Sequence, residues 1–247
     1  MTSQDAVLRI LNHEISGLEE SIELSCLYNQ PLDIISNQGA EMLHAAMYGT
    51  RCTGSAGSGW DTVDKGESKF SSRVQSRSCA NEECKSKVVF FLDQCPECGS
   101  TEFKKYPKDS RFGISAKSHI EYLEELNGYR LTLLEPKTFS PDCREFVLRS
   151  WFIETKDEWL TTYAQYQLDS PKSNHINFMP LGKDFFRSSP CLHLQATLTI
   201  EGAVIEYFDP TNKVPESVPA RFSKNTIEEH FGSKNFGKDR GITRRAA

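Results

Sequence analysis

The first thirty residues carry apolar side chains at helical spacing. One face of this segment holds Leu8, Leu11, Ile15 and Leu18, which recur at the three- and four-residue intervals of an amphipathic helix. We predict one or two helices here. Pro31 ends the pattern, because proline cannot continue a helix.

A further helix is predicted from about residue 37 to residue 47. Ser36 or Asn37 can cap its first turn, and Gly49 follows as a stop signal. This predicted helix carries one acidic residue, Glu41. A loop rich in glycine and serine then occupies residues 52–59.

Strand patterns dominate the middle and later parts of the chain. Alternating side chains predict a strand over residues 70–77, and the apolar run at 129–136, after a turn at Asn127-Gly128, predicts a buried central strand. Residues 144–154 predict another strand, 157–168 a helix, and 192–210 a hairpin that turns at Glu201-Gly202. The fold class is therefore α/β or α+β, with a central mixed β-sheet flanked by helices.

Length and composition fit a globular protein. The 247 residues can form one large domain with a small appendage, and we expect residues 1–247 to be a single domain. The N-terminus lacks the basic start and apolar run of a signal peptide, and no segment has about 20 consecutive apolar residues, so we expect a cytoplasmic protein. The net charge of −5 argues weakly against nucleic acid, but a local basic cleft is compatible with it.

Four of the eight cysteines cluster in an insert over residues 78–100. Cys79 and Cys84 form one close pair, and Cys95 and Cys98 form the other, with ten residues between the pairs. This spacing is typical of a four-thiolate Zn²⁺ site, with each pair on a tight turn and the spacer in a short hairpin. Gly99 allows the backbone to fold back beneath the metal. A closed shell of four sulfurs predicts a structural ion.

The stretch GWDTVDKGESK, residues 59–69, concentrates carboxylates beside a lysine. A three-residue loop at residues 64–66, with Gly66 left-handed, would pair Asp61 with Lys69 and place both on the same face as Glu67. Two carboxylates suit Mg²⁺, and an ammonium beside them can hold a water molecule. A two-residue loop would instead select Asp64 as the first acid.

This pattern resembles the PD-(D/E)XK nucleases, whose site is an acid followed by Glu-x-Lys on adjoining strands. Five residues separate Asp61 from Glu67, which is similar to the compact spacing of the mismatch-repair nicking endonuclease and of several type II restriction enzymes. Relatives of this kind carry a helix glutamate that reaches the metal, and Glu41 matches it. The likeness covers roughly residues 37–74. It departs from the family in lacking a proline before Asp61 and in having Ser68 between Glu67 and Lys69.

The resemblance implies a Mg²⁺-dependent, sequence-specific endonuclease for double-stranded DNA, of type II restriction kind and prokaryotic origin. Asp61 and Glu67 would hold the ion with the scissile phosphate, Glu41 would orient a metal-bound water or support a second ion, and Lys69 would position and help deprotonate the attacking water. The product would carry a 5′-phosphate. A symmetric DNA site is expected to require a homodimer.

Polar residues that follow the lysine are candidates for DNA contact. They are Ser72, Arg73, Gln75 and Arg77. Arginine can bridge guanine and glutamine can bridge adenine, whereas serine suits phosphate, and an ordinary polar edge strand is the alternative. The basic tail from residue 234 and the polar segment 170–190 are also candidates for DNA contact or for solvated chain.

Other interpretations remain for the position of the site and for the function. A second possible catalytic group, Asp109, Ser115, Lys117 and Glu121 or Glu124, resembles a restriction-enzyme variant. For this segment we prefer the interpretation of a core strand that has Lys117 and His119 on one side. At the level of function, the chain is alternatively a non-catalytic zinc-ribbon protein that binds DNA or protein, or a repair nickase directed to mismatches or lesions.

Overall fold

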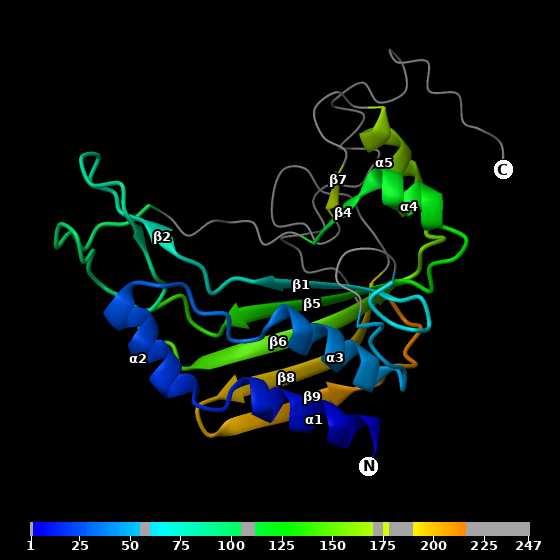
Figure 1. Cartoon of the computed structure of the whole chain (residues 1–247), viewed down its shortest axis with the longest axis horizontal. Helices are drawn as coiled ribbons and strands as arrows, with labels where there is room; N and C mark the ends of the chain where they lie inside the picture. Colours follow the sequence, from blue (N-terminus) through cyan, green and yellow to red (C-terminus); the bar gives the residue numbers. More distant parts are fainter. Residues whose placement is uncertain (1, 55–59, 105–111, 170–174, 178–189, 216–247) are drawn as a thin grey trace.

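The centre of the molecule is a five-stranded mixed sheet (Figure 1). The computed structural model describes residues 2–54, 60–104, 112–169, 175–177 and 190–215. The sheet has the order β1-β5-β6-β8-β9, with bounds β1 Glu67–Ser72, β5 Tyr129–Pro136, β6 Glu145–Ile153, β8 Cys191–Thr199 and β9 Gly202–Phe208. Strand β1 is parallel to β5, and the other pairs are antiparallel. The predicted class of a mixed sheet flanked by helices is confirmed.

Three helices precede the sheet in the chain, and two of them cover one of its faces. They are α1 (Ser3–Glu14), α2 (Leu18–Tyr28) and α3 (Asn37–Met47). The Ser36 side chain caps α3 by accepting a hydrogen bond from the Gly39 amide at 2.8 Å. The prediction of one or two N-terminal helices is confirmed with two, and the prediction of a helix at 37–47 is confirmed.

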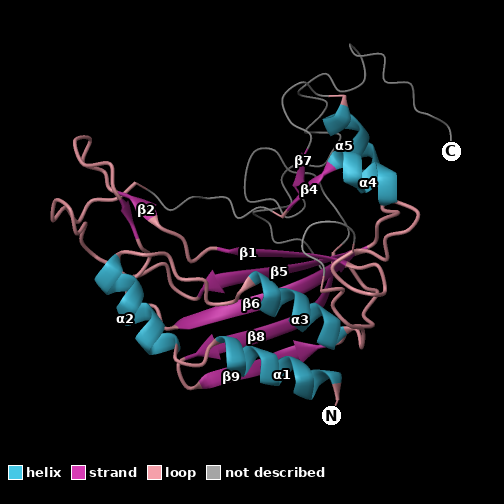
Figure 2. Cartoon of the chain, in the orientation of Figure 1, coloured by secondary structure: helices cyan, strands magenta, loops and turns pink. Residues whose placement is uncertain are grey.

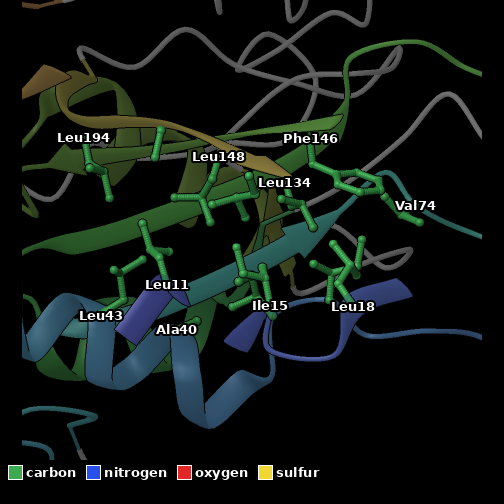
Figure 3. Packing of buried hydrophobic residues seen from close by; sticks show 14 of the residues in the cluster. Leu11, Ile15, Leu18, Ala40, Leu43, Val74, Leu134, Phe146, Leu148 and Leu194 are labelled. Atoms are coloured by element: carbon green, nitrogen blue, oxygen red, sulfur yellow. The ribbon is translucent and has the colours of Figure 1, made fainter. Parts of the chain in front are cut away.

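Helices α1 and α3 pack on this face through a large apolar core (Figure 3). Leu11 and Leu43 project from the helices towards Leu134 of β5 and Leu148 of β6. All four side chains are buried. Apolar residues recur every three to four positions along the helices and at every second position along the strands, so each element places one apolar stripe in the layer between helices and sheet. Strand β5 is buried at every position, as the apolar run predicts.

A small lobe covers one end of the opposite face (Figure 1). It comprises β4 (Gly113–Ser115), α4 (Ala116–Tyr122), α5 (Glu158–Leu168) and β7 (His175–Asn177). The expected core strand containing Lys117 and His119 is wrong, because Ser115 caps a helix instead and accepts from the Ser118 amide. We call this unit the α4 lobe. Its apolar residues pack against Leu131 and Trp151 of the sheet.

A second lobe, which we call the cysteine lobe, extends from the other end of β1 (Figure 2). It contains β2 (Arg77–Ser78) and β3 (Lys87–Val88), paired antiparallel. The strand expected over 70–77 begins earlier and ends at Ser72, where the side-chain hydroxyl accepts from the Val74 amide and turns the chain. In the part of the chain that the structure describes, no helix is long and apolar enough to cross a membrane.

Candidate active site and metal centre

Strand β1 is an edge strand that presents Glu67 and Lys69 on the same side. Their cross-strand partners in β5 are Tyr129 and Leu131, which belong to the core beneath the α4 lobe. Lys69 Nζ donates a hydrogen bond to Glu67 Oε1 at 2.5 Å. Both side chains are partly buried, with 29% and 21% of their surfaces exposed, so a reactant can reach them while much of the bulk water is kept away.

Asp61 lies along the free edge of β1. The Glu67 amide donates to Gly128 beside β5, so the next amide along the strand, that of Ser68, points the opposite way. That amide donates to Asp61 Oδ2 at 2.6 Å. The Asp61 carboxylate therefore stands in line with the strand edge, next to the side on which Glu67 and Lys69 project.

The predicted hairpin register is wrong, although Asp61 still reaches the site. The Asp61 amide bonds to the Gly66 carbonyl at 3.2 Å, so Asp61 does not pair with Lys69. The turn closes instead through the Lys65 amide and the Thr62 carbonyl at 2.9 Å, and Lys65 has the positive φ of 63° that was expected of Gly66. The reason is that β1 pairs in parallel with β5, which no local turn rule reveals.

Position 66 has no room for a side chain, so a glycine is required there. A Cβ at this position would lie 2.4 Å from the Cζ of Arg130. Arg130 is 1% exposed, projects from β5, and donates to the Thr62 hydroxyl at 2.8 Å and to the Asp64 carboxylate. The glycine therefore lets a buried guanidinium hold the turn from inside.

Asp64 belongs to this turn and serves as the counter-charge of Arg130. Burial opposes ionisation, but hydrogen bonds from Arg130 and Thr62 outweigh it and lower the pKa of Asp64. Asp61 instead affects the pKa of Glu41 and of Glu67. Of the two acids that the sequence leaves open, the structure brings Asp61 to Glu67 and assigns Asp64 to an internal ion pair.

Glu41 on α3 completes a group of three carboxylates around one lysine. Burial and then the nearby Asp61 charge raise the pKa of Glu41, and Lys69 opposes them. Burial also raises the pKa of Glu67, against the attraction of Lys69, and Asp61 and Glu41 add to the rise. These four groups carry a formal excess of two negative charges at neutral pH, which a divalent cation can offset.

The carboxylates fit an ion by charge and donor type but do not form a closed shell. Mg²⁺ prefers carboxylate and water oxygens. Among the described residues, the group of three or more potential ligands whose ligand atoms all lie within 4.8 Å of one another is the four-cysteine cluster. The oxygens of the three carboxylates therefore do not all lie within that distance of one another, although the charges of the acids act on one another.

A buried polar network lies on the opposite side of β1 from Glu67 and Lys69. His44 of α3 bonds to the hydroxyls of Ser68 at 2.9 Å and of Thr132 at 2.7 Å, and Thr132 bonds on to Ser150. Burial lowers the pKa of His44 to about 3, so its ring is neutral. This network explains the serine between the site's glutamate and lysine, because a partner within α3 satisfies its hydroxyl.

The four cysteines of the insert form the second site. Cys79 Sγ lies 3.7 Å from Cys98 Sγ, and Cys84 Sγ lies 3.6 Å from Cys95 Sγ. A tetrahedral zinc ion with Zn–S bonds of about 2.3 Å requires sulfurs about 3.8 Å apart. The cluster therefore matches the size of a four-thiolate metal centre and could hold Zn²⁺.

The backbone around the cysteines is only partly as predicted. Gly99 is left-handed, with φ of 71°, and its amide bonds to the Cys95 carbonyl at 2.8 Å, as expected of the second turn. The ten-residue spacer does not form its own hairpin, because β3 pairs with β2 and the next residues, Phe90 and Phe91, insert into the main core. The insert is consequently anchored to the sheet domain.

Two of the four candidate DNA contacts are arginines with partners inside the protein. Arg73 forms an ion pair with Glu135 at 2.9 Å. Arg77 is buried, donates to the Leu92 carbonyl, and stacks over the Phe103 ring at 3.9 Å. In this structure both stabilise the connection between β1 and the cysteine lobe, so base reading by either would require breaking these contacts.

The other two candidates, Ser72 and Gln75, are half-buried at the end of β1. The Gln75 side chain donates to the Ser72 carbonyl at 2.6 Å. Their contact with DNA stays a prediction. Among the remaining candidates, Lys117 is exposed on α4 and pairs with Glu121 at 3.5 Å, whereas Asp109, the basic tail and most of segment 170–190 lie outside the described residues.

Sequence reasoning missed Arg130 and His44. Arg130 had a signal, since it is the one basic residue in the apolar run YRLTLLEP, and a buried charge in a central strand needs a partner. The sequence carries no signal for the role of His44, because its partners Ser68 and Thr132 are 24 and 88 residues away along the chain. Comparisons with protein-family models, with curated proteins and with solved structures find no match to the chain.

Proposed function

We propose that the protein is a Mg²⁺-dependent endonuclease that hydrolyses phosphodiester bonds in double-stranded DNA, in the manner of a type II restriction enzyme. One observation carries this proposal. Glu41, Asp61, Glu67 and Lys69 come from a helix, a loop and an edge strand, and the charges of Asp61 and Lys69 act on both Glu41 and Glu67, while Lys69 also donates a hydrogen bond to Glu67. Partly buried acids with raised pKa values beside other charged groups are typical of functional sites.

The chain's own groups have distinct parts in the proposed reaction. Lys69 gives one of its three ammonium donors to Glu67, which leaves donors for the attacking water and for a phosphate oxygen. Asp61 and Glu67, with Glu41 beside them, are the groups that would hold Mg²⁺. The ion, when bound, supplies positive charge that stabilises the developing negative charge on the phosphate.

Cleavage of plasmid or phage DNA with Mg²⁺ tests the proposal. Wild-type protein is expected to give discrete fragments with 5′-phosphates, whereas Glu67→Gln and Lys69→Ala lose at least about a hundredfold in rate, as is usual for removal of one group that stabilises the transition state. Because burial raises the pKa of Glu67, the neutral Gln variant should be at least as stable as wild type in urea. Loss of activity in it then cannot be attributed to unfolding.

The exposed pair Lys117 and Glu121 provides the matched control. Lys117→Ala and Glu121→Gln make the same chemical changes on α4, and cleavage should persist in both. If the Lys117 change abolished cleavage while the Lys69 change did not, the rival constellation would be the active site. Discrete fragments from both the Glu67 and Lys69 variants would refute the site proposed here.

The four-cysteine cluster is proposed to hold a structural Zn²⁺. Elemental analysis of the purified protein is expected to give about one zinc per chain, since four thiolates close the shell of a single ion. A fully folded protein without zinc, and with all four cysteines reduced, would contradict this assignment.

A second candidate function rests on the same cluster, which is the better-formed of the two sites. A zinc-ribbon protein that binds DNA without cutting it predicts tight binding that persists without Mg²⁺, together with no cleavage of varied sequences. A repair nickase would instead nick mismatched or damaged duplexes and spare intact ones. For the restriction-type function, we propose a homodimer, and the molecular mass of the DNA complex in solution tests it.

A further inference from the structure

The two turns that carry the four clustered cysteines are built alike. The amide of the first cysteine in each turn donates to the carbonyl of a serine at 2.9 Å, which joins Cys79 to Ser86 and Cys95 to Ser100. In both turns the serine stands two positions after the second cysteine, and the residue between them is left-handed. The two turns can therefore be compared sulfur by sulfur.

The second cysteines of the two turns differ in hydrogen bonding. Cys84 Sγ lies 3.0 Å from the Ser86 hydroxyl. A sulfur that binds a metal ion has lost its hydrogen, so the hydroxyl is then the donor in this contact. In the other turn, the Ser100 hydroxyl accepts from the Glu102 amide at 3.1 Å and, in the described part of the chain, makes no hydrogen bond with Cys98. Cys84 therefore has a donor that Cys98 lacks.

The four sulfurs also differ in their access to solvent. Cys79 and Cys95 are buried, with 0% and 1% of their surfaces exposed, and Cys84 is half-buried. Cys98 is exposed, and its sulfur lies 3.7 Å from that of Cys79. Oxidation of thiolates follows their exposure, and redox-sensitive cysteines commonly have a second cysteine beside them that closes a disulfide. Cys98 and Cys79 meet both conditions.

We propose that Cys98 is a site of oxidation by peroxides and that Cys79 closes a disulfide with it. The Cys98 thiolate attacks one oxygen of hydrogen peroxide with an electron pair. The S–O bond of a sulfenic acid forms, the O–O bond breaks and hydroxide leaves. The Cys79 thiolate then attacks the Cys98 sulfur, so that the S–S bond forms, the S–O bond breaks and a second hydroxide leaves. Protons from solvent convert both hydroxides to water.

Oxidation removes two of the four ligands of the proposed zinc ion. We expect the ion to dissociate, because structural zinc sites in proteins are almost always four-coordinate and their ligands must be thiolates rather than disulfides. Phe90 and Phe91, which follow β3, belong to the main core, so oxidation should also lower the melting temperature of the domain. The thiol chemistry is independent of the proposed nuclease activity and rests on the zinc assignment only for the released ion.

Treatment of the zinc-loaded, full-length protein with a small molar excess of hydrogen peroxide tests the proposal. A colorimetric zinc indicator measures the released metal, and about one ion per chain is expected from a site that holds one. Dithiothreitol and added zinc should reverse the change, because a disulfide is reducible by thiols whereas higher oxidation states of sulfur are not.

Peptide mapping identifies the disulfide. Trypsin alone leaves the two cysteines of each turn in one peptide, since neither lysine nor arginine lies between them. A protease that cleaves after glutamate separates them, at residues 82, 83 and 97. Mass spectrometry of the double digest should show Cys79 linked to Cys98, while Cys84 and Cys95 remain reduced.

The Ser86 hydroxyl allows a test that leaves all four ligands in place. Iodoacetamide alkylates thiolates, and on the zinc-loaded protein it should react faster with Cys98 than with Cys84. Ser86→Ala removes the donor and should raise the alkylation rate of Cys84 by about three- to tenfold, the effect of one hydrogen bond. Ser100→Ala makes the same change in the other turn and should alter neither rate, because its hydroxyl is bonded to Glu102.

Three results would overturn the proposal: zinc retained with four reduced cysteines after peroxide treatment, a disulfide that joins Cys84 to Cys95 first, or equal alkylation rates of Cys98 and Cys84 in wild type. If the purified protein contains no zinc, the zinc assignment fails, and the Cys79–Cys98 disulfide still decides the oxidation chemistry. A protein that forms this disulfide but cleaves no DNA would overturn the nuclease proposal alone.

Discussion

At the scale of single residues, the two faces of β1 have opposite chemistry. Glu67 and Lys69 form a partly exposed ion pair on one face, whereas Ser68, between them, is bonded to a buried neutral histidine on the other. The strand period of two produces this separation. The two residues that we propose for catalysis therefore flank a serine that is bonded to a buried polar network.

The His44 network makes stability depend on pH. The histidine pKa falls from 6.5 to about 3 on folding, so between these values the unfolded chain binds a proton that the folded protein does not. Stability contributed by neutral His44 is present above pH 6.5 and is lost as the pH falls, by about 2 kcal/mol at pH 5. Urea unfolding at pH 7 and pH 5 should show a smaller drop in His44→Gln than in wild type.

His44→Gln also loses hydrogen bonds, which lowers its free energy of unfolding by the same amount at both pH values. The difference in free energy of unfolding between pH 7 and pH 5 is therefore free of this cost. His119, whose pKa also falls on folding, is present in both proteins and contributes equally to both drops. An identical drop in wild type and variant would show that His44 is already protonated in the folded state at pH 5, or that its neighbours compensate for it.

At the scale of elements, the turn from Thr62 to Lys65 is where local rules and tertiary structure disagree. Sequence chemistry favours Gly66 as the left-handed residue, but the structure uses glycine there because Arg130 approaches it. A turn built around a buried guanidinium needs its counter-charge at a fixed position. Asp64 supplies it, and Asp61 is thereby left for the site.

Substitution of the two aspartates should separate structure from chemistry. Asp64→Asn is expected to cost about 2 kcal/mol of unfolding free energy, less than a fully buried pair because the carboxylate is partly exposed, while the folded fraction still cleaves DNA. Asp61→Asn should abolish cleavage with a smaller change in stability. Urea unfolding and cleavage rates of the same preparations measure both quantities.

The exposed Val63 in the same turn provides a control, because Val63→Ala should change neither stability nor cleavage. In the opposite outcome, Asp64→Asn stays stable but loses all activity. Asp64 would then be the first acid of the site, as the alternative two-residue loop predicts.

At the scale of the whole molecule, two lobes stand at opposite ends of β1 (Figure 1). The α4 lobe is tied to the site loop by the Lys65–Glu125 ion pair and by the edge contact of Trp60 with Tyr122, whose ring centroids are 5.0 Å apart. The cysteine lobe is anchored by Phe91, which packs edge-on against Phe146 of β6. The site strand thus lies between the two lobes.

Because Phe90 and Phe91, which follow β3, belong to the main core, loss of the proposed zinc ion should affect the whole domain. Cys98→Ser removes an exposed ligand and should lower the melting temperature in a single cooperative transition, since binding energy for a structural ion is also folding energy. Cys26→Ser changes a half-buried cysteine outside the cluster and should leave zinc content unchanged. Two separate calorimetric transitions in the Cys98 variant would show that the lobe unfolds independently.

Much of the fold was predictable because its signals are local. Helix α3 matches its predicted limits, since Ser36 caps its start and Gly49 follows its C-cap, Tyr48. Strands β5 and β6, helix α5 and the β8–β9 hairpin follow the apolar patterns. Helix α4 was missed because its seven residues are too short for a clear period. The cysteine cluster was predictable because ligand spacing alone implies a metal centre.

The sequence by itself determined which residue types are available near β1: an acid, a Glu-x-Lys triplet and a helix glutamate, together with four thiols at zinc spacing. Only the tertiary structure decided how they meet. The parallel pairing of β1 with β5 joins residues about sixty positions apart, and it brings Arg130 to Asp64, Tyr129 to Glu67, and Asp61 to the strand edge. Contacts of this kind depend on the packing of distant segments, which no local pattern encodes.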